Sequence, residues 1–399
     1  MTNNEKIYIN GKEIQNRVVF QPMEGCDCNL DGSPSDLTVQ KYVKNVKSGA
    51  GTVWFEANAV CSEGRTNPRQ MWITEENLPI YKDFIANLRK IAREENGFEP
   101  IFLIQLTHSG RQSMTPMIAY RNSVYEATRP VSDGNIVSDE YLDTLPEKFA
   151  RSARLAMEAG FDGVDVKSCH GYLFQELLSA YNRQGRYGGS FENRTKLLTN
   201  CFMAVKNAVE DDFIVASRLG LCDMVPYPNG FGTDKDGNID LKEPFKLVEK
   251  LHGLGLNLIN VTVGNPYYNP HVNRPFRTGP YKPSEQPSVG LARYEFVEKE
   301  LKKAFPDILV VGSGLSYYRE NLIEKSEELL NGGVCDFVGY GRETLAYPEF
   351  YKDWLQGKFN SKKTCVTCSK CTALMRGKCV SGCAVYNEYY RNLFKENIK

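Results

Sequence analysis

The chain has 399 residues, of which 49 are basic and 49 acidic, so its formal net charge is zero. A balanced charge gives no general attraction to nucleic acid or to a membrane surface, and a small molecule is therefore the expected partner. The length suffices for one large domain with a sizeable core and an appendage, although length alone also allows two equal domains.

The termini and the cysteines indicate the cellular compartment. The first six residues are polar and lack the apolar core of a signal peptide, and no apolar stretch is long enough to span a bilayer. A soluble, cytoplasmic protein is expected. Twelve cysteines in a chain without an export signal favour reduced thiols or metal ligands over disulfides.

Short β-branched or apolar segments alternate along the chain with longer helical patterns. The predicted strands are residues 18–20, 52–55, 101–106, 163–167, 213–218, 258–262, 308–312 and 336–340. Predicted helices between them include 145–159, 192–209 and 243–254. Eight strands separated by helices predict an α/β fold of the closed (β/α)8 type, the TIM barrel, with buried parallel strands.

An open, doubly wound sheet is the alternative fold. No Gly-x-Gly-x-x-Gly motif follows any predicted strand, since Gly312-Ser-Gly314 lacks the third glycine, and a dinucleotide-binding half is therefore unsupported. Two long segments, 110–143 and 265–286, are rich in Pro, Tyr, Asn and Arg. Loops of this length usually have a function, so lids or substrate walls are expected here rather than solvated excursions.

A domain boundary is expected near residues 357–363, where polar linker residues precede a group of cysteines. Residues 1–357 would form the barrel, and residues 358–399 a small cysteine-rich C-terminal extension.

The cysteines of this extension have the spacing of metal ligands. They follow the pattern Cys365-x2-Cys368-x2-Cys371-x7-Cys379-x3-Cys383. Close thiolates together with a distant one can bind a [4Fe–4S] cluster or a tetrahedral zinc ion. The expected ligands are Cys365, Cys368, Cys371 and Cys383, with Cys379 as the spare, although Cys379 could replace Cys383. Loose thiols are the alternative.

A polar cluster follows the fourth predicted strand. Lys167, His170 and Tyr172 would stand at its carboxyl end, where barrel enzymes carry their active sites. The surrounding sequence, Gly-Phe-Asp-Gly-Val-Asp-Val-Lys-Ser-Cys-His-Gly-Tyr-Leu-Phe-Gln-Glu from residue 160 and Tyr-Gly-Gly-Ser-Phe-Glu-Asn-Arg from residue 187, closely resembles the old yellow enzyme, or NADH:flavin oxidoreductase, family. The resemblance is to the branch that includes 2,4-dienoyl-CoA reductases.

This resemblance implies FMN at the mouth of the barrel. A flavin needs hydrogen bonds to its polar ring edge, a cation near the ring carbonyl that gains charge on reduction, and donors for its phosphate. By resemblance, Gln105 pairs with the pyrimidine edge and Arg218 stabilises the reduced flavin. The implied flavin-binding residues are Pro22, Met23, Glu24, Ala57, Gln105, Arg218, Ser313, Gly314, Gly341 and Arg342. Taken singly, each could be an ion-pair partner, a polar strand end or a turn former.

The resemblance also implies roles for the polar cluster. His170 and its partner at position 167 would bind the electron-withdrawing group of an activated alkene, and Tyr172 would protonate its α-carbon. Lys167 departs from the family, which commonly has histidine there. Lysine is a compact cation without an acceptor. It could stabilise an enolate, favour a carboxylate-bearing substrate, or turn away toward Asp165 or Glu176.

The second long segment offers further candidates. Tyr267, Tyr268 and His271 are expected to line the substrate pocket or to assist protonation.

These residues together predict an FMN-dependent ene-reductase acting on α,β-unsaturated carbonyl compounds. NAD(P)H or a separate electron-donor protein would supply electrons, because the resembling larger enzymes continue into flavin- and nicotinamide-binding domains whereas this chain stops at Lys399. No nucleic acid or membrane partner is expected, and a homo-oligomer is compatible with the sequence. Two alternatives remain: a flavin and iron–sulfur electron-transfer module, and an oxidative flavoenzyme that demethylates amines.

Overall fold

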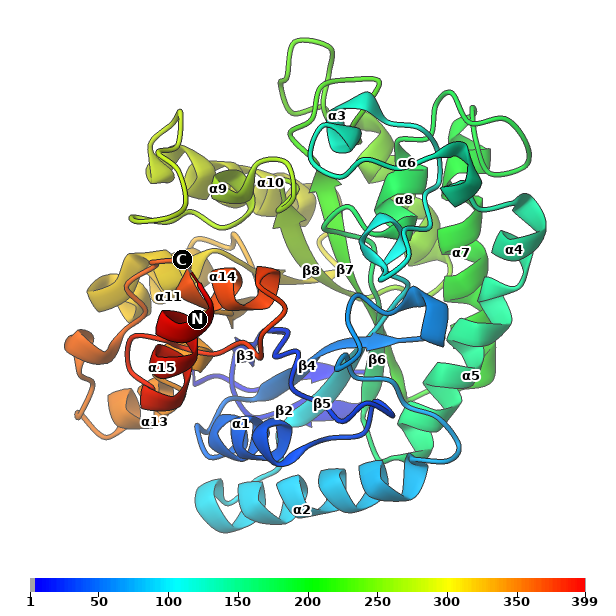
Figure 1. Cartoon of the computed structure of the whole chain (residues 1–399). Helices are drawn as coiled ribbons and strands as arrows, with labels where there is room; N and C mark the ends of the chain where they lie inside the picture. Colours follow the sequence, from blue (N-terminus) through cyan, green and yellow to red (C-terminus); the bar gives the residue numbers. More distant parts are fainter. Residues whose placement is uncertain (1–3, 399) are drawn as a thin grey trace.

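The structure, a computed structural model, describes residues 4–398. Eight parallel strands close into a barrel in the order β10-β3-β4-β5-β6-β7-β8-β9, with helices around it (Figure 1). The strands are β3 (Val18–Phe20), β4 (Thr52–Ala59), β5 (Ile101–Thr107), β6 (Gly163–Val166), β7 (Ile214–Cys222), β8 (Leu258–Val263), β9 (Leu309–Gly312) and β10 (Phe337–Tyr340). The predicted (β/α)8 barrel is confirmed, and the open sheet is wrong.

An N-terminal hairpin covers one end of the barrel. Its antiparallel strands β1 (Ile7–Ile9) and β2 (Lys12–Ile14) were not predicted. Ile9 and Ile14 are buried against side chains from the amino-terminal ends of the barrel strands, among them Ile101 and Ile214. Burial of these apolar side chains closes the barrel at the end opposite the carboxyl ends of its strands.

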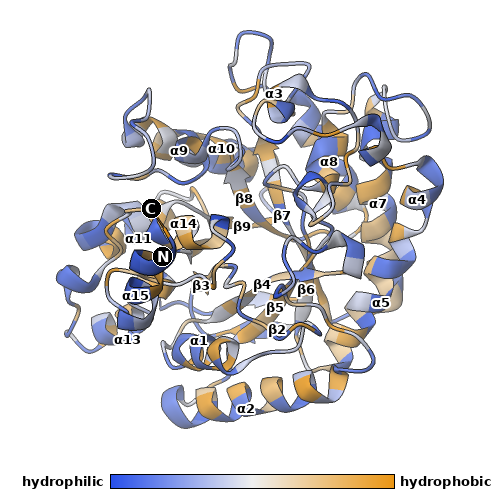
Figure 2. Ribbon diagram, in the orientation of Figure 1, coloured by the Kyte–Doolittle hydropathy of each residue, from blue (hydrophilic) through white to orange (hydrophobic). Residues whose placement is uncertain are grey.

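Amphipathic helices surround the strands, and Figure 2 shows apolar residues gathered on their barrel side. The helices are α1 (Asp36–Val46), α2 (Leu78–Asn96), α5 (Leu145–Glu158), α7 (Phe191–Ala208), α8 (Lys242–Gly253), α10 (Pro287–Ala304), α11 (Leu322–Asn331), α12 (Glu343–Ala346) and α13 (Phe350–Leu355), with short 3-10 turns η1 (Ser62–Gly64) and η4 (Leu315–Asn321). In α5, for example, Phe149, Ala153 and Ala156 are buried. Over residues 4–398, none of the helices combines the length and the apolar composition needed to cross a bilayer.

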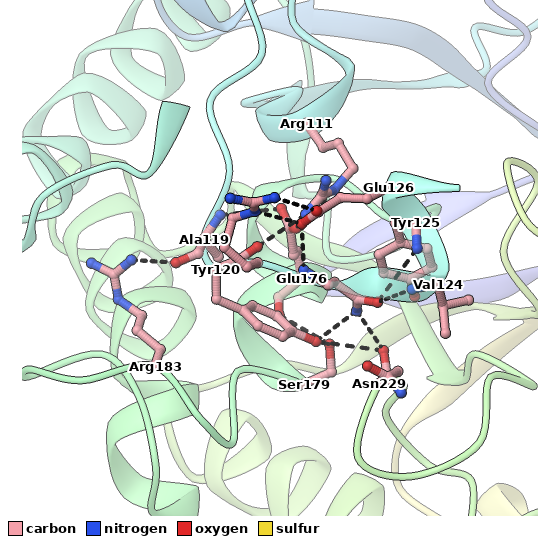
Figure 3. Close-up of polar contacts among 12 residues, drawn as sticks. Arg111, Ala119, Tyr120, Val124, Tyr125, Glu126, Glu176, Ser179, Arg183 and Asn229 are labelled. Carbon is pink, nitrogen blue, oxygen red and sulfur yellow. Dashed lines mark hydrogen bonds and ion pairs between the residues drawn. The ribbon is translucent and has the colours of Figure 1, made fainter. Parts of the chain in front are cut away.

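The first long segment is anchored to the helix that follows the polar cluster. It contains η2 (Gly110–Gln112), α3 (Ser123–Glu126), η3 (Asp133–Asn135) and α4 (Asp139–Asp143), and it packs on α6 (Leu173–Leu178). The carboxylate of Glu176 accepts from Arg111 Nε (2.9 Å) and from the Ala119 N–H (3.2 Å), as Figure 3 shows. Because Tyr172 is the N-cap of α6, this buried network fixes the position of its backbone.

The second long segment contains α9 (Pro270–Asn273), and the cysteine-rich extension packs against it. The extension consists of η5 (Ser361–Lys363), α14 (Lys370–Arg376) and α15 (Glu388–Asn397). Arg274 donates to Thr372 Oγ1 (2.6 Å), and the Ser381 N–H donates to the Gly25 carbonyl (2.6 Å). The extension therefore lies at the mouth of the barrel.

Candidate active site

A cavity of about 180 Å³ opens among the carboxyl ends of the barrel strands. All of the residues that the sequence suggested for the flavin, and the three of the polar cluster, lie in its wall. These residues are Pro22, Met23, Glu24, Ala57, Gln105, Lys167, His170, Tyr172, Arg218, Ser313, Gly314, Gly341 and Arg342. They come from seven of the eight strands, so the barrel topology brings them together.

Asp165, on β6, organises the strand ends beneath the cavity. It accepts hydrogen bonds from Gln105 Nε2 (2.6 Å), from the Arg218 N–H (2.6 Å) and from Trp54 Nε1 (3.1 Å). Burial raises the pKa of this carboxyl to about 6. One side chain thus ties β4, β5 and β7 to β6 and holds the Gln105 amide in place.

Three arginines of the cavity have hydrogen-bonding atoms that the rest of the described chain leaves unused. Arg218 Nε, Arg274 Nε and Arg342 Nη1 are buried and have no partner among residues 4–398. Other atoms of the Arg342 guanidinium are engaged, since its Nη2 donates to the Pro275 carbonyl (2.8 Å). Buried donors normally have partners, so these atoms indicate an anionic or polar ligand. Arg218 Nε suits the ring oxygen of a flavin, and Arg342 Nη1 suits its phosphate.

Ser313 is less free than the sequence suggested. Its hydroxyl donates to the Val261 carbonyl (2.8 Å) and accepts from Gln21 Nε2 (2.7 Å), and its N–H donates to Glu298 Oε1 (2.9 Å). Gly314 has a φ of 88°, a left-handed conformation that favours glycine. Of the suggested phosphate ligands, Arg342 has a free side-chain donor, whereas the Ser313 hydroxyl is engaged.

Lys167 and Tyr172 lie against each other. The Lys167 ammonium is 3.9 Å from the centroid of the Tyr172 ring. Burial lowers the pKa of Lys167 below its usual range and raises that of Tyr172 well above it, so the phenol is protonated at neutral pH. Lys167 forms no ion pair within residues 4–398. The Glu176 carboxylate is instead paired with the Arg111 guanidinium. The alternative that Lys167 turns onto Asp165 or Glu176 is wrong, because those carboxylates already have other donors.

His170 is held in an uncommon backbone conformation with a φ of 64°. The following N–H, of Gly171, donates to Gln175 Oε1 (2.6 Å), and Gln175 Nε2 in turn donates to Asp223. Burial, with the nearby cations, lowers the pKa of His170 well below 6.5, so its imidazole is neutral. Its Nε2 is buried without a partner among the described residues. A strained residue with an unused ring nitrogen is typical of a ligand-binding position.

Tyr267 joins the site, whereas the other two candidates of its segment do not. Its ring stacks on that of Tyr172 with centroids 6.5 Å apart. Burial raises the pKa of Tyr267 to about 12. Tyr268 is exposed, and His271 pairs with the Tyr281 hydroxyl (2.7 Å) away from the cavity. Tyr268 and His271 thus lie outside the cavity wall.

Several lining residues were not anticipated from the sequence. They are Gln21, Pro266, Asn273, Arg274, Tyr294, Ser316, Thr372, Met375 and Arg376. Three of them lie on or beside α14 in the extension, which the sequence suggested as a separate unit. A second cavity of about 620 Å³ adjoins the first through Glu24, Tyr267, Met375 and Arg376. Gln112, Met114 and Arg129 of the first long segment form its outer wall.

Four of the five cysteines of the extension border one small cavity. These are Cys365, Cys368, Cys371 and Cys383, and Cys379 is outside it. Burial raises the pKa of Cys365 to about 12. Within residues 4–398, no three His, Cys, Asp or Glu side chains stand at the spacing of ligands to a single metal ion, and no disulfide joins the cysteines. Arg342 lines both this cavity and the barrel cavity, so the two are neighbours.

Comparison with known proteins identifies the family. Residues 5–358 match the NADH:flavin oxidoreductase / NADH oxidase family. The NADH oxidase of Thermoanaerobacter brockii is 27% identical over 371 residues, covering 89% of this chain and 51% of that protein. The NADPH dehydrogenase of Listeria welshimeri is 27% identical over 351 residues, covering 85% and 90%. A 2-naphthoyl-CoA reductase complex has a TM-score of 0.79 at 19% identity, covering 98% of this chain and 58% of that one.

The chain therefore belongs to the NADH:flavin oxidoreductase / NADH oxidase family and is a flavin-dependent oxidoreductase. It spans about half the length of the Thermoanaerobacter relative and nearly all of the Listeria relative. The fold likeness to 2-naphthoyl-CoA reductase extends over almost the whole chain.

Proposed function

We propose that the protein is an FMN-dependent ene-reductase. Bound FMN would supply hydride to the β-carbon of an α,β-unsaturated carbonyl compound. The observation that carries the proposal is the protonated Tyr172 phenol, which lies in the same cavity wall as the free donors of Arg218 and Arg342. Reduction of an alkene by a flavin requires a proton donor, here Tyr172, close to cations that can bind the flavin, here Arg218 and Arg342.

Different residues of the chain would bind the substrate carbonyl and donate the proton. Neutral His170 and the Lys167 ammonium would bind the carbonyl oxygen and stabilise negative charge as it develops there. Tyr172 would then give the proton of its Oη to the α-carbon, and the Tyr267 hydroxyl beside it would orient that proton. The low-dielectric surroundings that shift these pKa values also strengthen each interaction.

Anaerobic stopped-flow mixing of the reduced protein with a panel of enones, enoates, dienoyl thioesters and secondary amines tests the reaction. Rapid flavin reoxidation by one class of alkene, with formation of the saturated product, is the expected result. If only amines react, and they reduce the oxidised flavin instead, the site is oxidative and the proposal is wrong.

The cofactor is expected to be FMN. Arg342 offers a free donor for a single terminal phosphate, and no dinucleotide-binding fold is present among residues 4–398. Flavin released by heat from the purified protein should co-migrate with FMN in chromatography. Recovery of FAD alone would contradict this expectation.

Replacing Arg218 by alanine is expected to make the flavin harder to reduce, because the cation nearest the reduced ring is lost. The measurement is a spectroscopic titration of the flavin potential, which should fall relative to the parent. Arg218→Lys is the matched control and should recover part of the shift, since it retains the charge but not the planar donor set. An unchanged potential at full flavin occupancy would remove Arg218 from the flavin site.

Substrate preference is expected to depend on Lys167. Lys167→Met keeps the length of the side chain and removes its charge, so selectivity for enoates over enones should fall by roughly tenfold or more. In the parent, this selectivity should also decline as the pH rises through the lowered pKa of Lys167, because only the protonated amine attracts a carboxylate. The kcat/KM ratio for matched enoate and enone substrates, measured against pH, checks both statements. Identical profiles in the variant and the parent would exclude the role.

We further propose that Cys365, Cys368, Cys371 and Cys383 bind a [4Fe–4S] cluster, with structural zinc as the alternative. Their shared cavity supports the proposal, and a metal bound there would have to displace the protons of the buried thiols. Arg342 stands between this cavity and the flavin-type cavity, so such a centre could exchange electrons with the flavin. The electron donor would be NAD(P)H, as the names of the relatives suggest, or a carrier protein acting through the cysteine-bound centre in the cytoplasm.

A further inference from the structure

We propose that Asp223 is a positioning residue, which fixes the backbone turn at His170 through the side-chain amide of Gln175. This inference rests on the proposed function, in which His170 binds the carbonyl oxygen of the substrate, and extends it to a residue outside the cavity wall. It is carried by the Asp223 network, a buried set of hydrogen bonds that joins Phe231, Asp223, Gln175 and Gly171.

His170 and Gly171 form a tight turn between β6 and α6. Their φ angles are 64° and 67°, so two consecutive residues lie in the left-handed region. Glycine adopts this conformation readily, but histidine does so only where the surrounding structure holds it. The peptide between the two residues is held by the hydrogen bond from the Gly171 N–H to Gln175 Oε1 (2.6 Å). Because this peptide follows directly after the His170 Cα, its orientation sets the direction of the imidazole.

The orientation of the Gln175 amide is determined by its two neighbours. At one end is the Gly171 N–H, which can only donate, and at the other is the Asp223 carboxylate, which can only accept when it is ionised. If the amide were turned over, its NH2 group would face the N–H and its oxygen would face the carboxylate. Both contacts would then be repulsive. The carboxylate therefore selects the orientation in which Gln175 accepts from Gly171.

Asp223 suits this role because both of its oxygens accept hydrogen bonds. Its Oδ1 accepts from Gln175, and its Oδ2 accepts from the Phe231 N–H (3.0 Å). Asp223 and Gln175 are each only 1% exposed. Within residues 4–398, Asp223 forms no ion pair, and burial raises its pKa to about 7. A buried carboxylate without a cation is costly, but it supplies two acceptors where an amide would supply one.

The surrounding backbone is packed closely against the Asp223 network. A Cβ on Gly220 would lie 2.3 Å from Gln175 Nε2, and a Cβ on Gly171 would lie 2.6 Å from Asn265 Nδ2. The Gly220 N–H also donates to the Ser168 carbonyl (2.9 Å), which ties the end of β7 to the segment before the turn. Close packing on both sides thus restricts movement of the amide.

An exchange of carboxylate and amide tests the network. In Asp223→Asn, the new side chain has one oxygen and one NH2 group, so it cannot accept from both Phe231 and Gln175. If its oxygen stays with Phe231, its NH2 group turns the Gln175 amide over, and the Gly171 N–H loses its acceptor. Adding Gln175→Glu restores every pair. The carboxylate at position 175 then accepts from Gly171 and from the NH2 group at position 223.

The His170 imidazole provides a readout that does not depend on activity. The chain has only four histidines, so 15N-histidine labelling of the FMN-containing protein gives few signals, and His170→Asn identifies that of His170. At about pH 8.5 the Asp223 carboxylate is ionised, and the parent should show a single His170 environment. Asp223→Asn should shift or split this signal, and adding Gln175→Glu should return it to its parental position. The other three signals should not change.

The rate of alkene reduction should follow the same order. With 2-cyclohexenone as the probe, reoxidation of the reduced flavin is followed anaerobically by stopped flow. Asp223→Asn is expected to lower the limiting rate constant by about tenfold to a hundredfold, since a small displacement of a substrate-binding group has an effect of this size. The double variant should recover to within about threefold of the parent. Reduction of the flavin by dithionite should be equal in all three proteins.

Asp162→Asn is the matched control. The Asp162 carboxylate also accepts from a backbone N–H, that of Phe102 (2.7 Å), and from a side chain, Arg89 Nη2 (2.8 Å), but it lies at the opposite end of β6. This variant should lower thermal stability without changing the His170 signal or the rate constant. The same pattern in Asp223→Asn would indicate a merely structural role and would overturn the proposal.

The outcomes separate the Asp223 network from the proposed reaction. If the His170 signal moves in Asp223→Asn and returns in the double variant, the network is supported even when no alkene is reduced, and the ene-reductase proposal alone fails. An unchanged signal in both Asp223→Asn and Asp223→Ala, or a double variant that matches Asp223→Asn, would overturn the network. If Asp223→Asn does not fold, a folded double variant with the parental signal supports the network, and an unfolded one contradicts it.

Discussion

Tyr172→Phe is expected to lower the rate of alkene reduction by roughly two to four powers of ten while leaving reduction of the flavin intact. The variant keeps the ring beneath the Lys167 ammonium and removes only the acidic hydroxyl. Because burial raises the pKa of Tyr172 well above 10, the parent enzyme should retain its proton donor throughout the neutral range. Single-turnover measurements of the two half-reactions separate the proton-transfer step from the supply of electrons.

Tyr294→Phe is the matched control. Tyr294 also lines the cavity and is buried, but its hydroxyl donates to the backbone carbonyl of Asn273 (2.7 Å). Loss of this hydroxyl should reduce stability by about 1 kcal/mol and should change the rate of alkene reduction by less than tenfold. If both half-reactions decline equally in Tyr172→Phe, its hydroxyl serves the structure and not the chemistry.

The second large effect is expected in the cysteine-rich extension. Cys371→Ser should abolish the metal centre, whereas Cys379→Ser should retain it, because Cys371 borders the shared cavity and Cys379 does not. Anaerobically purified parent protein should contain about four iron and four sulfide ions per chain if the centre is a [4Fe–4S] cluster, or one zinc if it is structural. Iron, sulfide and zinc analysis of the three proteins decides between them.

Loss of the metal centre should also weaken flavin binding in the barrel cavity. Thr372, the neighbour of Cys371 on α14, lines the flavin-type cavity and accepts a hydrogen bond from Arg274. Disorder of the metal-free extension is therefore expected to weaken flavin retention in Cys371→Ser, which equilibrium dialysis can measure. If the parent contains no metal and Cys371→Ser matches it in stability and activity, these cysteines only pack the extension.

The barrel could be predicted from local signals in the sequence, and most residues of the candidate site from the resemblance to the old yellow enzyme family. Buried parallel strands are short apolar runs, and amphipathic helices such as α5 and α7 repeat with their own period, so strand order along the chain was enough to predict closure. The motif from Lys167 to Tyr172 lies on one strand end, and Gln105, Arg218 and Arg342 occupy equivalent ends. Once the barrel closes, these positions meet by geometry.

Only the tertiary structure decided which groups complete the site and what their neighbours are. Nothing local marks Arg274 or Thr372 as cavity residues, since an arginine in a loop has the same sequence signature whether it faces solvent or a ligand. Their placement depends on packing between segments almost a hundred residues apart. The orientation of Lys167 was likewise undetermined by its sequence neighbours, because the distant Arg111 occupies Glu176 and leaves the ammonium over the Tyr172 ring. The positions of Arg274 and Thr372 and the orientation of Lys167 therefore depend on long-range burial and hydrogen bonding, which no short sequence pattern encodes.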